Sequence, residues 1–300
     1  MKVLVTGATG YIGGRLVPRL LDRSHAVDAV RVLVREPGRI EAKPWAERVE
    51  VAVGDLLDPE SLRPALDGID TAYCLVHSME SGKDFEERDR TAAANFVAAA
   101  RAAGISKVIY LGGLLPEGAE VSDHLRSRAE VGEILRNGLP ATEFRAGPII
   151  GSGPASFEMV RYLTERLPAM IAPKWVLNEV QPIGVRDVLS YLVLALEREP
   201  LGVIDIGSDR MTFRQMMLSY ASVRGLRRLI VPVPVLTPRL AGLWVGLITP
   251  IPNTLAVPII KGMIRSVVAD TARARQLFPE VEPVSYREAV ELAVGRAAAG

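Results

Sequence analysis

Short apolar segments alternate with segments of helical periodicity over the first half of the chain. The apolar segments indicate strands, because each is brief, rich in Val, Leu and Ile, and bounded by glycine or polar residues. Strands are expected at 2–5, 30–34, 49–53, 70–76, 107–111 and 141–145, with helices at 12–23, 59–66, 83–103 and 123–136. Strands that alternate with helices in this way form βαβ units. The sequence therefore predicts an α/β fold with a doubly wound parallel sheet.

The alternation fades after about residue 150. Helices are still expected at 154–166, 185–197 and 212–224, and a strand at 203–206, but no strict pattern connects them. We therefore divide the chain into a sheet domain at 1–150 and a smaller C-terminal α+β lobe at 151–300, partly interleaved with the first. The lobe is expected to serve a substrate or a partner.

Three glycines follow the first strand directly and open the first helix. Gly7 permits a tight turn, Gly10 lets the backbone approach a pyrophosphate, and Gly13 lets the helix pack closely on the strand. The N-terminus of the helix adds N–H groups and a partial positive charge for phosphates. The segment therefore predicts a dinucleotide-binding loop, with contacts expected from Thr6, Gly7, Thr9, Gly10, Tyr11, Ile12 and Gly13.

The chain resembles the extended or atypical branch of the short-chain dehydrogenases/reductases, which share a Rossmann domain. The matching residues are Thr6–Gly13 in the glycine loop, Gly54-Asp55-Leu56, Asn95, Tyr110-Leu111-Gly112-Gly113 and Arg145-Ala146-Gly147-Pro148. The resemblance covers about residues 1–200, and the remainder looks like a bacterial, NmrA-like subgroup. Similar members serve as reductases, as regulators that sense the cofactor, and as accessory subunits of respiratory complex I.

The residue that ends the second strand selects between NAD and NADP. An acid at this place binds the ribose 2′-hydroxyl, whereas an arginine pairs with a 2′-phosphate. Arg35 stands at the strand end and Arg39 could reach the same phosphate, while the first acid, Glu36, comes one position later. NADP, as NADPH, is therefore favoured over NAD. The alternative is that Arg35 is an ordinary solvated charge.

The resemblance implies further cofactor contacts at the ends of other strands. Asp55 and Leu56 match the pair that holds the adenine. Val76 and His77 end the fourth strand and should border the ribose and the nicotinamide. Pro148 and Ile149 follow the sixth strand and should form a wall beside the nicotinamide.

The residues usual for catalysis in active relatives are replaced here. Those relatives carry a Ser after the fifth strand and a Tyr-x-x-x-Lys pair on the next helix, but this chain has Gly112 and Gly113 after the strand. His124 and Arg128 align with the Tyr and Lys positions, four residues apart and hence on one helical face. His124 could transfer a proton and Arg128 could hold ribose hydroxyls. A solvated His124 near the start of the helix is the alternative.

Two functions remain open from the sequence. One is an NADPH-dependent oxidoreductase that reduces a small, largely apolar carbonyl, quinone or enone compound. The other is a non-catalytic NADP(H)-binding sensor, or an accessory or membrane-peripheral subunit, which the missing Ser, Tyr and Lys favour.

Composition narrows the set of partners. The chain has 36 basic and 35 acidic residues, so its charge gives no reason to expect nucleic acid. Its one cysteine, Cys74, lies in an apolar run and is expected to be a buried thiol, and three histidines without clustered acids give no metal site. No signal peptide is recognisable, so we expect a cytoplasmic protein. The oligomeric state stays open.

One long stretch is unusually apolar. Residues 229–260 contain a single charged residue, Arg239, and six prolines interrupt them. The longest uninterrupted helical piece, 240–249, is shorter than the roughly 20 residues that a bilayer span needs. The stretch is therefore expected to be a buried or dimer-forming subdomain, with peripheral membrane contact as the alternative.

Overall fold

The computed structural model describes the chain except residues 77–83, 117–120, 234–244, 247 and 299–300. It divides into two compact units. We call Met1–Gly112, Ser127–Arg145 and Leu189–Ile204 the sheet unit, and Gly113–Arg126, Ala146–Val188 and Asp205–Gly300 the second unit.

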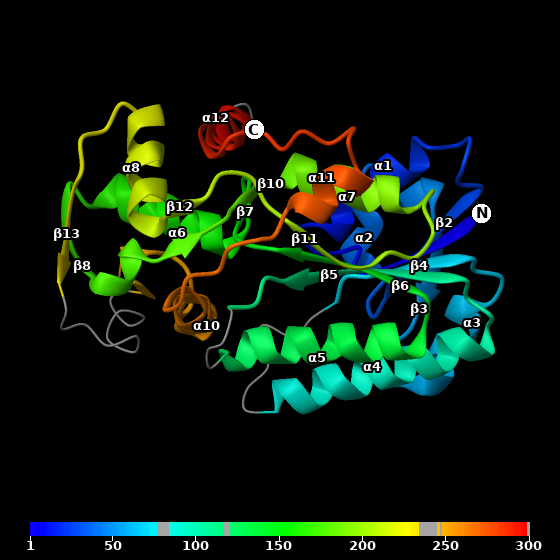
Figure 1. Cartoon of the computed structure of the whole chain (residues 1–300). Coiled ribbons are helices and arrows are strands. Elements are labelled where there is room, and N and C mark those ends of the chain that lie inside the picture. The colour runs from blue at the N-terminus through cyan, green and yellow to red at the C-terminus, as the bar shows by residue number, and fades with distance from the viewer. Residues whose placement is uncertain (77–83, 117–120, 234–244, 247, 299–300) are drawn as a thin grey trace. The chain divides into compact units, whose positions relative to one another are not determined.

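A seven-stranded sheet forms the centre of the sheet unit, as the strand pattern predicts (Figure 1). Its order is β11-β6-β5-β4-β1-β2-β3, and the strands are β1 (Lys2–Thr6), β2 (Ala29–Val34), β3 (Glu50–Val53), β4 (Thr71–Cys74), β5 (Lys107–Gly113), β6 (Ala141–Ala146) and β11 (Gly202–Ile206). Parallel registers join β1 to β2 and β4, β2 to β3, and β4 to β5. All six early strands are confirmed. The strand expected at 203–206 joins this same sheet as β11.

Helices cover both faces of this sheet (Figure 1). They are α1 (Gly13–Leu21), α2 (Gly38–Glu41), α3 (Pro59–Leu66), α4 (Phe85–Ala102), α5 (Asp123–Gly138) and α7 (Val185–Ala195), with a 3-10 turn η1 (Ala46–Arg48). On the face covered by α3, α4 and α5, the core contains Leu4, Leu62, Phe96 and Leu135, all fully buried. The inner strands are therefore covered on both faces, which explains why they read as nearly continuous apolar runs, whereas Val51 and Val53 of the edge strand β3 are exposed.

Buried Lys107 joins the sheet to the end of α7. Its ammonium group donates to the backbone carbonyl oxygens of Ala195 and Leu196 at 3.2 and 2.8 Å, and to that of Arg198 at 2.5 Å. These carbonyls lie at and just after the end of α7, where carbonyl groups lack the regular N–H partner four residues further along the helix. Burial lowers the pKa of Lys107.

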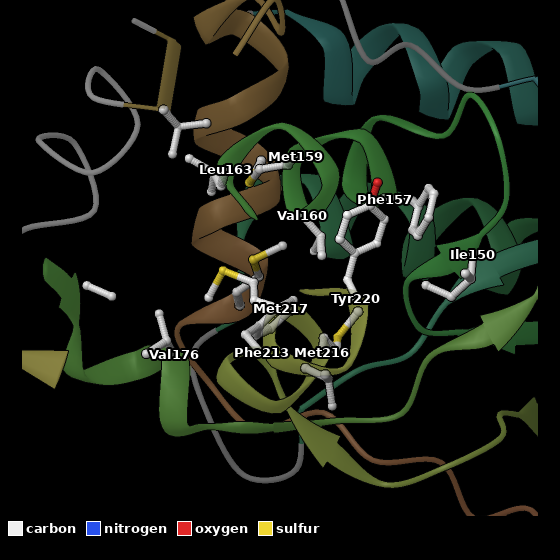
Figure 2. Close-up of a cluster of buried hydrophobic side chains, with 14 of the residues drawn as sticks. Ile150, Phe157, Met159, Val160, Leu163, Val176, Phe213, Met216, Met217 and Tyr220 are labelled. Carbon is white, nitrogen blue, oxygen red and sulfur yellow. The ribbon is translucent and has the colours of Figure 1, made fainter. Parts of the chain in front are cut away.

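The second unit consists of helices and short strand pairs. Its elements are β7 (Ile149–Ile150), α6 (Ala155–Arg166), β8 (Ala169–Pro173), η2 (Lys174–Leu177), β9 (Glu179–Val180), β10 (Ile183–Gly184), β12 (Met211–Thr212), α8 (Phe213–Val223), β13 (Leu229–Val233), α10 (Asn253–Met263), α11 (Ala272–Leu277) and α12 (Tyr286–Ala298). The pairs β7–β10 and β8–β13 are parallel, and β9–β12 is antiparallel. Residues of α6 and α8 face one another in its core, where methionines fill space between few aromatic rings (Figure 2).

The apolar stretch 229–260 contributes to this core in part. Ile251, Ala256 and Ile260 are buried, and β13 and α10 begin within the stretch. The helical piece expected at 240–249 falls largely outside the described residues. Within the described chain, no helix combines the length and the hydropathy that crossing a membrane requires.

Candidate cofactor site

The loop between β1 and α1 has no room for side chains at two of its glycines. Gly7 has φ +72°, and a Cβ built on it would stand 2.9 Å from the backbone carbonyl of Leu75. A Cβ on Gly13 would stand 2.2 Å from the carbonyl oxygen of Gly7. The amide of Gly10 donates to that same oxygen at 2.9 Å, which closes the turn. The backbone therefore forms the compact loop that a pyrophosphate requires.

The other loop residues differ in how much they present to solvent. Gly10 is exposed and Thr9, Tyr11 and Ile12 are partly exposed. The guanidinium of Arg15 stacks on the Tyr11 ring at 3.8 Å and donates to its carbonyl oxygen at 3.1 Å. Thr6 is fully buried, and its hydroxyl donates to the carbonyl of Tyr73 and accepts from the amide of Leu75, both at 3.1 Å. The Thr6 side chain therefore ties β1 to β4, which leaves its backbone for any cofactor contact.

Two arginines at the carboxyl end of β2 are exposed. Arg35 directly follows the last strand residue, and Arg39 lies in α2. Neither guanidinium makes a hydrogen bond or an ion pair within the described part of the chain. Arg31, in the same strand, instead pairs with Glu50 at 2.7 Å. Two unpaired guanidinium groups so close in sequence are a suitable receptor for a phosphate.

Hydrogen bonds between its own polar groups hold the loop after β3. Asp55 accepts from the amide of Leu57 at 3.0 Å, and its backbone amide donates to the Ser61 hydroxyl at 3.0 Å. Leu56 is buried, and its carbonyl accepts from the side-chain amide of Asn95 at 3.0 Å. Asn95 therefore links α4 to the loop expected to hold the adenine.

After β4 the structure describes Leu75 and Val76, and the next described residue is Asp84. Val76 is exposed, and His77 lies outside the described residues. Cys74 is buried, as expected, and burial raises the pKa of its thiol to about 12. A thiol with so high a pKa stays protonated and unreactive at neutral pH.

Arg128 reaches the carboxyl end of β5 from helix α5. Its Nη2 donates to the carbonyl oxygen of Leu111 at 3.1 Å, and its own carbonyl accepts from the Tyr110 hydroxyl at 3.1 Å. Its Nε is buried and makes no hydrogen bond within the described structure. His124 is half-buried in the first turn of the same helix, one turn before Arg128, as the spacing predicts.

A buried carboxylate occupies the space beside Gly112. Glu143 in β6 is 1% exposed, and its carboxylate pairs with Arg145 at 2.8 Å and with Arg136. A Cβ on Gly112 would stand 3.0 Å from Glu143 Oε1, and one on Gly132 would stand 2.5 Å from Oε2. This ion network was not predicted from the sequence. The available signal was an acid in the middle of a strand expected to be buried, because buried charges require partners.

Pro148 and Ile149 lie in the second unit, where backbone contacts fix them. The Pro148 carbonyl accepts from the amide of Ile183 at 3.0 Å, and Ile149 pairs with Ile183 in the β7–β10 sheet. A Cβ on Gly147 would stand 2.3 Å from the carbonyl oxygen of Gln181, so this turn also depends on glycine.

Parallel registers bring most of the expected cofactor residues to one edge of the sheet. The glycine loop, Arg35, Asp55 and Val76 follow the ends of β1 to β4, and the Arg128 guanidinium lies at the end of β5. This is the edge at which open α/β sheets bind ligands. His124, Pro148 and Ile149 belong to the second unit.

Comparison with known proteins identifies the cofactor domain. Residues 7–142 match a family model described as NAD(P)H-binding. The 3 beta-hydroxysteroid dehydrogenase/Delta 5-->4-isomerase of Mycobacterium tuberculosis is 34% identical over 119 residues, which are 36% of this chain and 30% of that protein. The first curated relatives are matched over 30% to 53% of their own length.

Solved structures match nearly the whole chain. Triphenylmethane reductase of a Citrobacter species, complexed with NADP(H), has TM-score 0.75 and 22% identity, over 97% of this chain and 99% of that one. The NADPH-dependent quinone oxidoreductase of Escherichia coli has TM-score 0.75 and 19% identity, over 96% and 98%. At this identity the likeness establishes the fold. The chain therefore contains an NAD(P)H-binding Rossmann domain, with neighbours among the extended and atypical short-chain dehydrogenases/reductases.

Proposed function

We propose that the protein is an NADP(H)-dependent oxidoreductase that reduces a small apolar carbonyl, quinone or enone compound. The observation that carries the choice of NADP(H) is the pair of exposed arginines after β2, Arg35 and Arg39, which have no partner in the described structure. A 2′-phosphate would provide an anionic partner for both guanidinium groups. The reductases and dehydrogenases among the similar proteins support the reaction class.

The residues of the loop fit a dinucleotide. The exposed backbone at Gly10 and the start of α1 can accept a pyrophosphate, because neither Gly7 nor Gly13 places a side chain in the turn. Bound NADPH supplies a hydride to the electrophilic carbon of the substrate. Arg128 is the residue we assign to the ribose hydroxyls, and its Nε has no hydrogen-bond partner in the described structure. His124 is the residue we assign to the proton that neutralises the oxygen of the reduced group.

A second candidate is a non-catalytic NADP(H)-binding protein, and the packing around Gly112 favours it. The position after Tyr110 and Leu111 that carries a hydroxyl in active relatives is adjacent to the Glu143 carboxylate, and a Cβ there would stand only 3.0 Å from Glu143 Oε1. Any oxidoreductase built on this chain must therefore work without that hydroxyl.

Steady-state kinetics distinguish the two candidates. NADPH oxidation is followed by the loss of its absorbance with a panel of benzoquinone, menadione, simple enones and aromatic aldehydes. An oxidoreductase gives substrate-dependent oxidation with stoichiometric product, because each hydride lost appears in one reduced molecule. The non-catalytic candidate binds NADPH and gives no turnover with any of these compounds.

Two variants then test the roles of single residues. His124→Ala should lower kcat by about 100-fold or more while NADPH affinity stays near that of the wild type, as expected for loss of a proton donor. Arg136→Lys, which retains the charge near Glu143 away from His124, serves as a control for general disturbance of α5. Unchanged turnover in His124→Ala removes this residue from the mechanism while leaving NADPH binding untouched.

A further inference from the structure

The β8–β13 pair in the second unit has apolar residues on both of its faces. Strands alternate their side chains between the two faces of a sheet, so a pair packed on one side normally shows polar residues on the other. Met170, Ala172 and Ile230 are buried in the same core cluster as residues of α6 and α8. The opposite face consists of Ala169, Ile171, Leu229 and Val231, which are all exposed.

The register places these four outward residues side by side. Ala169 pairs with Leu229 and Ile171 with Val231, in parallel strands. Ile171 is 62% exposed, Leu229 60% and Val231 43%, and Leu177 in the following η2 turn is 43% exposed. We call Ala169, Ile171, Leu177, Leu229 and Val231 the outer apolar face. It contains half of the large apolar side chains that are exposed in the described chain.

The segments that carry this face are basic. Residues 166–177 and 227–233, which comprise the two strands and their flanks, contain four basic and no acidic residues. The rest of the chain has 32 basic and 35 acidic residues, so the excess of positive charge is local. Lys174 and Arg227 are exposed, and their side chains make no hydrogen bond or ion pair with any described residue. A second copy of the same basic surface would be repelled.

We propose that the outer apolar face is a peripheral membrane-binding surface that takes an anionic lipid bilayer. The apolar residues Ile171, Leu229 and Val231 would enter the interface, and Lys174 and Arg227 would pair with anionic headgroups. Such binding is confined to the bilayer interface and needs no membrane-spanning helix. It is independent of the proposed reaction, since no residue of the cofactor loop takes part.

Vesicle sedimentation with the full chain tests the surface directly. The probes are vesicles of phosphatidylcholine alone and vesicles of phosphatidylcholine with an equal share of phosphatidylglycerol, at low and high salt. The protein should sediment with the anionic vesicles, bind the neutral ones at least about tenfold more weakly, and dissociate as salt is raised. Absence of binding to anionic vesicles overturns the proposal.

Matched variants distinguish vesicle binding by the outer apolar face from nonspecific adsorption to vesicles. Ile171→Ser with Val231→Ser should weaken anionic-vesicle binding by about tenfold or more, because two interfacial side chains are lost. Arg227→Ala should weaken it about fivefold. Val51→Ser, at an apolar β3 residue that is 45% exposed, should bind like the wild type. Retained NADPH binding in all variants confirms that they fold.

Two other results would overturn the assignment. One is vesicle binding that the Ile171→Ser, Val231→Ser double variant leaves unchanged, because another surface is then responsible. The other is a concentration-dependent dimer, measured by sedimentation velocity without lipid, that the double variant abolishes. In that case the outer apolar face binds a second copy of the chain.

Discussion

Gly13 and Gly7 approach so closely that a Cβ on Gly13 would stand 2.2 Å from the Gly7 carbonyl oxygen. Replacement Gly13→Ala must therefore move the start of α1 or the turn before it. We expect a loss of about 1–3 kcal/mol in the free energy of unfolding, as for overpacked sites, together with loss of measurable NADPH binding. Denaturant unfolding and fluorescence titration check both. Gly295→Ala, in α12, meets no atom within 4 Å, so it should leave NADPH binding unchanged and raise the free energy of unfolding by up to about 1 kcal/mol, because alanine favours the helix.

Arg35 tests the choice between the two dinucleotides. Arg35→Ala should lower NADPH affinity by about 10- to 100-fold, the effect of losing a hydrogen bond to a charged group, and should leave NADH affinity nearly unchanged. Calorimetric titration with both cofactors measures this. The exposed Arg63, which pairs with Glu60 one turn before it in α3, supplies the control variant Arg63→Ala. Equal losses for NADPH and NADH would place Arg35 away from the 2′-phosphate.

Asp187 gives the second unit a distinctive pH dependence. Burial raises the pKa of its carboxyl from 3.8 to about 6, while the amide of Val284 donates to it at 3.2 Å. Between these two pKa values the folded state keeps a proton that the unfolded state has released. The retained proton therefore adds to the free energy of unfolding. This contribution is fully present below pH 3.8 and is lost as the pH rises through about 6.

The variant Asp187→Asn removes this titration but keeps an acceptor for the Val284 amide. The difference in free energy of unfolding between wild type and variant should fall by about 2 kcal/mol from pH 4 to pH 7. Urea unfolding at a series of pH values measures it. A difference that stays constant across the series would show that the carboxyl does not change its protonation there.

Glu143 holds two guanidinium groups within the sheet unit. Glu143→Gln leaves Arg136 and Arg145 without a counter-charge, and we expect a loss of about 3 kcal/mol in the free energy of unfolding. Glu130→Gln breaks a solvent-exposed pair with Arg90 and should cost less than about 1 kcal/mol. Similar small losses in both variants would mean that the Glu143 network contributes little.

Much of the sheet unit could be predicted from the sequence because its signals are local. Each early strand is a short apolar run, and the sequence order of strands and helices implies parallel pairing. β11 was recognised as a strand but not as a member of the sheet, because its pairing with β6 depends on chain that returns from the second unit. The position of Arg35 directly after β2 could be predicted from the same kind of local pattern.

The features that could not be predicted from the sequence are contacts between segments far apart in the chain. The link between Asn95 and the Leu56 carbonyl joins segments 39 positions apart. The contacts of Lys107 with the end of α7 join segments 88 to 91 positions apart. In the second unit, β8 and β13 pair although some 60 residues separate them in the sequence. Propensity and periodicity carry no information about such partners.

Titration of the purified chain with NADPH and with NADH measures the dinucleotide site itself, on which the proposed reaction depends. We expect one molecule of NADPH bound per chain, with at least about tenfold preference over NADH from the Arg35 and Arg39 guanidinium groups. No binding of either dinucleotide by a folded chain would contradict it.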